Sequence, residues 1–197
     1  FHFHGGHVSP GGIADNVLRF MEPGQSYDVE IELPADHPTG LYWYHPHLHG
    51  AADMQIASGM VGAIIIADDA ATVPEIAAAS EQVLVLAEAV FDGLYTVEEF
   101  DTLWPETATR FLMVNGQREP IIRMRPSEVQ RWNVLHTGYQ SDILMYLEGH
   151  SLNVFAFDGI TLPALESLDA VLMAPGQRAE ILVQAGDPGT YALTALP

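Results

Sequence analysis

Two histidine motifs constrain this chain more than any other feature of its sequence. The motif HFHG occupies residues 2–5 and the motif HPHLHG occupies residues 45–50, so these two segments hold five of the nine histidines. Residues at positions i and i+2 of a β-strand point to the same side of a sheet. Each motif therefore presents a pair of imidazoles, and two pairs that meet predict a metal site. Imidazole ligands with no cysteine nearby suit copper, zinc, iron or nickel.

The composition is typical of a folded chain with a substantial core. Hydrophobic residues make up 48% of the 197 residues and charged residues 17%, which is enough for one large or two ordinary domains. No apolar run approaches the roughly 18 residues that a membrane helix needs, so we expect no membrane span. Phe1 already lies inside a strand pattern, and we therefore expect the first domain to be incomplete at its N-terminus.

The charge of the chain is strongly acidic and restricts its partners. Seven basic residues face 26 acidic ones, which gives a formal net charge of -19. Phosphate groups are repelled by such a surface, which argues against nucleic acid and anionic membranes as partners and favours cations, metal ions included. The absence of cysteine excludes disulfides, thiolate catalysis and iron–sulfur clusters from this sequence.

The first third of the sequence predicts short strands that lead into the motifs. Residues 29–33 alternate apolar and charged side chains, as a half-exposed strand does. The aromatic run 41–44 predicts a strand that runs directly into the second motif. Residues 51–58 predict a short helix, and residues 61–67 predict a buried central strand.

The rest of the sequence predicts a second series of strands. Residues 68–80 are small and acidic and predict a linker or a short connecting helix. The strands expected after it cover residues 83–90, 111–114, 121–124, 129–135, 143–147, 152–157, 170–173, 179–183 and 191–193. Short strands separated by glycine turns favour an antiparallel-rich sandwich. We therefore expect two β-sandwich domains, a partial one at residues 1–72 and a second one at residues 73–197.

Three histidines outside the motifs have simpler interpretations. His37 lies in a turn flanked by prolines and is expected at the surface. His136 and His150 lie in the second half without a histidine partner, and we expect a structural role for both.

Four residues near the motifs are candidates for supporting roles. His7 and His49 either orient a ligand ring through a hydrogen bond or serve as polar packing, and we favour the first interpretation. Asp15 and Asp53 are candidates for carboxylate partners or water contacts near a metal. For Asp53 we rate an ordinary loop aspartate as highly as this supporting role. For Asp15 we favour the supporting role.

The number of ligands leaves the type of metal site open. A tetrahedral ion needs about four ligands, so the four motif histidines could close one zinc site. Such a closed site would leave a hydrolase no open coordination position. A cluster of several coppers would need more ligands than this sequence offers.

The motifs and their surroundings resemble the multicopper oxidase family, in particular its bacterial laccase-like members. In the first half the resemblance rests on residues 2–10, 15–16, 23–24, 40–50, 55, 59–60 and 62. In the second half it rests on segments similar to the second cupredoxin domain of the family, at residues 112–116, 131–132, 149–150, 158–159 and 174–180. The resemblance implies an all-β fold of two cupredoxin-like Greek-key β-sandwich domains.

The resemblance also implies a role for each motif histidine. His2 would ligate a type 2 copper, and His4, His45 and His47 would ligate a type 3 copper pair. His49 matches a family histidine that is not normally a ligand. The complete enzyme would couple one-electron oxidation of a reducing substrate (a phenol, an aromatic amine or a metal ion) to the four-electron reduction of O2 to water.

The sequence departs from the family pattern at the electron-entry site. It has no cysteine and no histidine after His150, so the type 1 copper site is absent and the type 2 and type 3 sites are half-formed. We expect the missing partner to be the third cupredoxin domain or the remainder of the same polypeptide, and this chain alone to be inactive. The alternative is a non-catalytic copper-binding or scaffold protein of two cupredoxin-like domains, and a single-metal hydrolase ranks third. An extracytoplasmic location follows from the resemblance alone.

Overall fold

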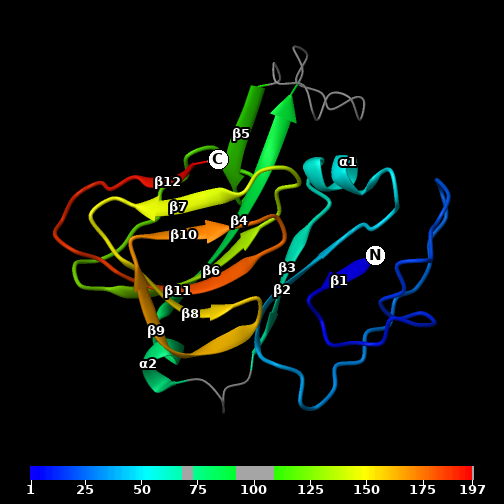
Figure 1. Cartoon of the computed structure of the whole chain (residues 1–197), viewed down its shortest axis with the longest axis horizontal. Helices are drawn as coiled ribbons and strands as arrows, with labels where there is room; N and C mark the ends of the chain where they lie inside the picture. The colour runs from blue at the N-terminus through cyan, green and yellow to red at the C-terminus, as the bar shows by residue number, and fades with distance from the viewer. Residues whose placement is uncertain (68–72, 92–108, 197) are drawn as a thin grey trace.

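The computed structural model describes residues 1–67, 73–91 and 109–196 and shows a chain built mainly of strands (Figure 1). Three strands near the N-terminus form one antiparallel sheet in the order β1-β2-β3. They are β1 (His2–His4), β2 (Gly40–His45) and β3 (Gly62–Ile66). The short helix α1 (Ala52–Ala57) connects β2 to β3, close to where it was expected.

The remaining strands form two sheets that share one core. The larger sheet has six strands in the order β5-β4-β6-β11-β8-β9 and the smaller has three in the order β10-β7-β12. In chain order these elements are α2 (Pro74–Ala77), β4 (Ser80–Phe91), β5 (Thr109–Val114), β6 (Val129–His136), β7 (Ile143–Leu147), β8 (Leu152–Phe157), β9 (Ile160–Leu168), β10 (Ala170–Met173), β11 (Arg178–Gln184) and β12 (Leu193–Leu196).

The core of this sandwich follows from the side-chain patterns of the two sheets. Strand β7 alternates buried and exposed positions, so Met145 faces inward while its neighbours face outward. Strands β6 and β11 are buried along most of their length, and their residues Val134 and Ile181 are fully buried. Val171 of β10 joins the same cluster, so the core lies between the two sheets, as in other β-sandwiches.

The N-terminal sheet packs through strand β2 against the outer face of the six-stranded sheet, opposite the core of the sandwich. Leu41 and Trp43 of β2 form a second buried cluster with Leu135 of β6. Val85 of β4 packs against the same cluster. The histidine motifs at the ends of β1 and β2 therefore lie close to the sandwich, which matters for the site described below (Figure 1).

Two expected strands are absent from the described structure, and both expectations were wrong for the same reason. Residues 29–33 and 121–124 alternate partly buried and more exposed side chains, as the sequence indicated, but they join no ladder. In the first segment Glu30 N–H donates to the carbonyl of Ile13 at 3.0 Å without further strand pairing. Alternation reports which side chains are buried, whereas a strand also needs a neighbour to hydrogen-bond.

The other differences between the expected and the observed elements are smaller. Strand β9 (Ile160–Leu168) was not expected, because its apolar residues do not alternate regularly and Pro163 interrupts the segment. Strand β12 (Leu193–Leu196) begins where residues 191–193 were expected to end. The linker expected at residues 68–80 contains α2, but its residues 68–72 lie outside the described structure. The division into residues 1–72 and 73–197 stays a prediction. No helix in the described ranges is long and apolar enough to cross a membrane.

The shared core predicts how much stability is lost when a buried apolar side chain is removed. Ile181→Ala should lower the free energy of unfolding by about 2–5 kcal/mol, because the side chain is fully buried between the sheets. The matched control is Leu172→Ala on β10, whose side chain is 63% exposed, and it should change stability by about 0.5 kcal/mol or less. Urea unfolding measures both, and equal losses would contradict this assignment of the core.

Candidate metal centre

The pairing of β1 with β2 brings the two histidine motifs together. The antiparallel register places His2 opposite His45 and His4 opposite Trp43. Residues directly opposite on neighbouring strands have Cβ atoms about 4.5–5.5 Å apart. The ladder therefore brings His2 and His4 of the first motif to His45 of the second, more than forty residues later in the sequence. Strand β2 ends at His45, so His47 follows the ladder rather than belonging to it.

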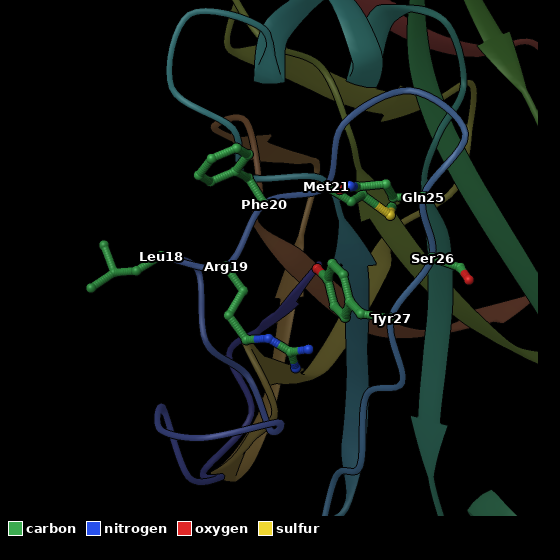
Figure 2. A pocket seen from close by; sticks show the side chains of 7 residues that line it. All are labelled: Leu18, Arg19, Phe20, Met21, Gln25, Ser26 and Tyr27. Carbon is green, nitrogen blue, oxygen red and sulfur yellow. The ribbon is translucent and has the colours of Figure 1, made fainter.

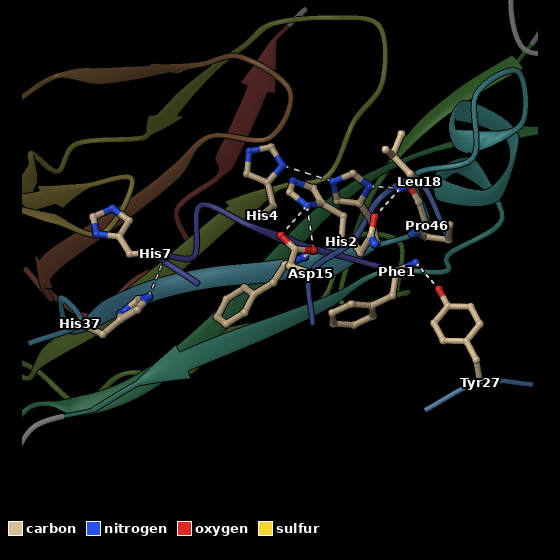
Figure 3. Close-up of polar contacts among 12 residues, drawn as sticks. Phe1, His2, His4, His7, Asp15, Leu18, Tyr27, His37 and Pro46 are labelled. Carbon is tan, nitrogen blue, oxygen red and sulfur yellow. Dashed lines mark hydrogen bonds and ion pairs between the residues drawn. The ribbon is translucent and has the colours of Figure 1, made fainter. Parts of the chain in front are cut away.

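Three of the four expected ligands bring one ring nitrogen each into a single small group. Nitrogen atoms of His2, His4 and His45 all lie within 4.8 Å of one another. Nδ1 of His4 lies 3.2 Å from Nε2 of His45 (Figure 3). His47 lies beside this group, with its ring centroid 5.1 Å from that of His2 and 5.8 Å from that of His45. We call these four residues the histidine cluster.

The other ring nitrogens of the cluster have partners of their own. Nδ1 of His2 lies 3.1 Å from the carboxylate of Asp15, and Nδ1 of His45 donates to the carbonyl of Pro46 at 2.8 Å. A hydrogen bond at one ring nitrogen fixes the tautomer and leaves the other nitrogen with a free lone pair. His2 and His45 are therefore prepared to offer Nε2 to a metal.

Two further observations fit a metal such as copper. Among the described residues, the buried Nδ1 of His47 has no hydrogen-bond partner, and such an atom calls for a ligand or a water. The rings of His4 and His45 both stack on Trp43, with centroids 4.8 Å and 4.2 Å away. A donor set of neutral imidazoles held by packing suits copper, zinc or another borderline ion.

Burial keeps two of these imidazoles neutral. Removal from water, together with the nearby positive charge of Arg178 and of the other histidines, lowers the pKa of His4 to about 3. Burial also lowers the pKa of His45 to about 4, although its hydrogen bond to Pro46 opposes the shift. Both rings are unprotonated near neutral pH and available as ligands.

Asp15 has the supporting role for which it was a candidate. Its side chain is nearly buried, and its carboxylate accepts from Phe3 N–H at 2.8 Å as well as contacting His2 (Figure 3). One carboxylate therefore holds both the backbone of β1 and the ring of the first motif histidine.

The remaining histidines do not join the cluster. His7 and His37 form a separate contact, in which the backbone N–H of His7 donates to Nε2 of His37 at 3.0 Å (Figure 3). His37 is only partly exposed, because it packs on Tyr42 at 5.1 Å, so its expected surface position was only partly right. His49 is exposed and touches the cluster only through the ring of His47, 6.0 Å away.

The other candidate residues lie elsewhere in the fold. Asp53 is in the first turn of α1, outside the group of His2, His4 and His45 whose ring nitrogens converge. His136 and His150 have the structural roles expected of them. Nε2 of His136 donates to the carbonyl of Ser141 at 2.9 Å, and the ring of His150 bridges Glu148 and Gly186.

The contribution of the six-stranded sheet to this site was not expected from the sequence. The turn before β11 reaches the cluster: a Cβ atom on Gly176 would lie 3.0 Å from Cε1 of His4. The buried guanidinium of Arg178 lies beside Gly5, the residue that follows His4. The segment 174–180 had been recognised as a family motif, but nothing in its spacing indicated contact with a histidine 172 to 174 positions away.

A surface pocket near the N-terminal loop is separate from the cluster. It is lined by Leu18, Arg19, Phe20, Met21, Gln25, Ser26 and Tyr27 (Figure 2). The guanidinium of Arg19 lies over the ring of Tyr27, 4.2 Å from its centroid. The pocket contains no member of the histidine cluster and supplies no ligand to it.

The lowered pKa values predict how the stability of the metal-free protein depends on pH. His4 and His45 take up protons on unfolding at any pH between about 4 and their ordinary value of 6.5, so acid favours the unfolded chain. Stability should be fully retained above that value and should fall as the pH drops from about 7 to about 5, where most carboxylates are still ionised. Differential scanning calorimetry at both pH values, with chelator present, measures the fall in Tm.

The matched comparison is the double variant His4→Asn with His45→Asn. Its fall in Tm between the same two pH values should be smaller than that of the wild type, because neither introduced side chain titrates. Equal falls in both proteins would show that other groups cause the acid sensitivity.

The double contact of Asp15 predicts a second effect on stability. Asp15→Ala leaves Phe3 N–H buried without a partner and should cost about 1–3 kcal/mol in unfolding free energy. Asp187→Ala, at an exposed position, is the control and should cost about 0.5 kcal/mol or less. Chemical denaturation of the metal-free proteins measures both, and a neutral Asp15→Ala would show that this carboxylate does not hold β1.

Known proteins with similar sequences carry a cell-division name. The protein named cell division protein FtsP of Edwardsiella tarda is 26% identical over 197 residues, which cover 96% of this chain and 40% of that protein. The protein of the same name from Salmonella typhimurium is 23% identical and is also covered to 40%. The chain therefore spans about two fifths of the length of these curated relatives.

Known structures with the same fold are copper oxidases. The blue copper oxidase from Nitrosomonas europaea matches with a TM-score of 0.79 at 20% identity, over 98% of this chain and 61% of that one. A variant of the McoA multicopper oxidase from Aquifex aeolicus matches with a TM-score of 0.75 at 23% identity, over 93% and 41%. These likenesses confirm the expected all-β fold of two cupredoxin-like Greek-key β-sandwich domains.

Family models agree with the resemblance noted in the sequence. One multicopper oxidase model matches residues 1–71, which include the complete histidine cluster. A second multicopper oxidase model matches residues 87–196, which include the segment that touches the cluster. On these matches, which together cover most of its length, the chain belongs to the multicopper oxidase family.

Proposed function

We propose that this chain is a copper-binding unit of two cupredoxin-like domains that does not itself catalyse the oxidation of a substrate. The observation that carries the proposal is the convergence of ring nitrogens from His2, His4 and His45 within 4.8 Å. Imidazole sites bind Cu²⁺ more tightly than the other divalent first-row ions, which favours copper over zinc. The name of the curated relatives, which refers to cell division, supports a role other than substrate oxidation.

The residues of the chain would hold copper in the following way. Asp15 and the Pro46 carbonyl fix the rings of His2 and His45, while Trp43 supports those of His4 and His45. Because the buried rings are already neutral, little proton release opposes metal binding at neutral pH. Bound copper would supply one-electron redox chemistry at this place. Under this proposal His2 belongs to a type 2 site, and His4, His45 and His47 belong to a type 3 pair.

A second candidate is that the chain forms part of a complete multicopper oxidase. It is favoured by the presence of all four histidines of the cluster and by the solved structures of similar fold, which include copper oxidases. Under this candidate the remaining ligands and a type 1 copper site come from outside residues 1–197. The reaction would be the oxidation of a small reducing substrate coupled to reduction of O2 to water, and the protein would act outside the cytoplasm.

Copper binding is the first prediction of both candidates. The metal-free chain should bind Cu²⁺ in competition with a chelator such as nitrilotriacetate and should prefer it to Zn²⁺. His4→Asn should weaken binding by at least about tenfold, because it removes a ring from the centre of the cluster. His150→Gln, far from the cluster in the second sandwich, is the control and should bind as the wild type does. A wild-type chain that binds no copper would refute the proposal.

Oxygen consumption tests whether residues 1–197 can turn over on their own, which neither candidate expects. The copper-loaded chain with a phenolic substrate should show no sustained O2 uptake, since its sequence contains no cysteine for an electron-entry site. An oxygen electrode measures this, with the free copper ion at equal concentration as the control. Sustained uptake that requires His4 would overturn the first candidate. The reading frame that encodes the protein separates the two candidates, because the second requires a further segment that supplies a cysteine and the remaining histidines.

A further inference from the structure

Arg178, at the start of β11, is the buried cation nearest to the histidine cluster. Its side chain is only 4% exposed, and every nitrogen of its guanidinium has a partner. Nε donates to the carbonyl of Leu41 at 3.1 Å, Nη1 to the carbonyl of Gly176 at 3.1 Å, and Nη2 to the carbonyl of Asp158 at 3.1 Å. Nη1 also pairs with the carboxylate of Asp158 at 3.0 Å.

Glu180 holds the same strand two positions further along β11. Its Oε1 accepts from Leu41 N–H at 3.2 Å, and its Oε2 pairs with Arg131. Side chains at positions i and i+2 of a strand lie on one side, so Arg178 and Glu180 reach β2 together. Both polar groups of the Leu41 backbone are therefore bound by side chains of the sandwich rather than by a neighbouring strand.

The position of Leu41 connects these contacts to the cluster. In an antiparallel sheet the backbone groups of alternate residues face the same edge of a strand. Leu41 thus faces the edge of β2 at which Trp43 and His45 pair with β1. Strand β1 ends at His4, opposite Trp43. At Leu41, two residues before Trp43 on the same edge of β2, the side chains of β11 take the place of β1.

The loop after His4 is fitted to the guanidinium. A Cβ atom on Gly5 would lie 2.3 Å from Nη2 of Arg178, so the guanidinium fills the space that a side chain would need. Gly5 also has a φ of 81°, which favours glycine. On the other side, Gly176 leaves room for the ring of His4. The ring of His4 therefore lies against Gly176, and the next residue, Gly5, lies against Arg178. Gly176 and Arg178 both come from the segment at the start of β11.

We propose that Arg178 is a positioning residue for the histidine cluster, which holds the backbone at Leu41 and Gly5 and thereby places the ring of His4 for metal binding. The effect on copper rests on the proposed function, whereas the effect on the ring does not. The position of the guanidinium matters more than its charge, because Asp158 partly neutralises it. The second sandwich is thus part of the metal site although it contributes no ligand.

The test compares Arg178→Lys and Arg178→Gln with the same two substitutions at Arg123. Arg123 is exposed and lines a different surface region, next to Arg125 and Glu128. Lysine keeps the positive charge but cannot reach three carbonyls at once, so it separates charge from position. Amide hydrogen exchange at Val134 and Ile181, both in the sandwich core, shows whether each variant keeps its fold.

The first readout uses metal-free protein and needs no copper. NMR cross-relaxation between the rings of His4 and Trp43, whose centroids lie 4.8 Å apart, reports the position of His4. Both Arg178 variants should lose this contact while core amides stay protected, and both Arg123 variants should keep it. An Arg178→Lys variant that retains the contact would overturn the proposal.

The second readout is the affinity for Cu²⁺, measured by chelator competition together with the electron paramagnetic resonance spectrum of the bound ion. Both Arg178 variants should bind at least about tenfold more weakly and give an altered spectrum, as follows when a residue behind a ligand is removed. Wild-type affinity and spectrum in Arg178→Lys would overturn the role in copper binding. If no protein in the series binds copper, the proposed function fails, and the ring contact alone decides the role of Arg178.

Discussion

The pairing of β1 with β2 is the interaction on which the candidate site depends. It is a ladder of three residue pairs, and its register sets His2 against His45 and His4 against Trp43. A shift by one residue would turn every side chain of β1 to the opposite face and separate the two motifs. Asp15 binds the middle of this short strand through Phe3 N–H, and the guanidinium of Arg178 fills the space beside Gly5, just after its end.

Local patterns in the sequence predicted the site better than they predicted the sheets. The His-x-His spacing fixes the relative direction of His2 and His4 within β1, so their convergence with His45 needed only one pairing to be right. His47 lies beyond the end of β2, where the strand period no longer applies. Residues 29–33 and 121–124 show the limit of such patterns. Their alternation correctly indicated partial burial, but hydrogen bonding to a neighbour depends on segments distant in sequence. Strand β9 (Ile160–Leu168) shows the reverse case: it forms a ladder with β8 although its apolar residues do not alternate and most of its side chains are exposed.

The contribution of the second sandwich could not be read from the sequence. Arg178 and Glu180 act on Leu41, which lies 137 and 139 positions earlier in the chain. A buried arginine bound to three carbonyls is costly to remove from water and is retained only where its hydrogen bonds are all formed. All the hydrogen bonds of Arg178 are formed at the contact between β2 and β11. The geometry of the histidines therefore depends on how these two sheets pack.

Fold and function are separable in this chain. A cupredoxin-like sandwich supports several activities, and its chemistry lies in the residues at one rim of the first domain. Relatives named for cell division and structures named as copper oxidases share the framework, so the framework alone cannot distinguish a redox enzyme from a binding unit. The distinction rests on electron supply. Under the proposed function the neutral, buried imidazoles would hold a metal, whereas turnover would also need a path by which electrons arrive. Residues 1–197 contain no cysteine thiolate for such a path.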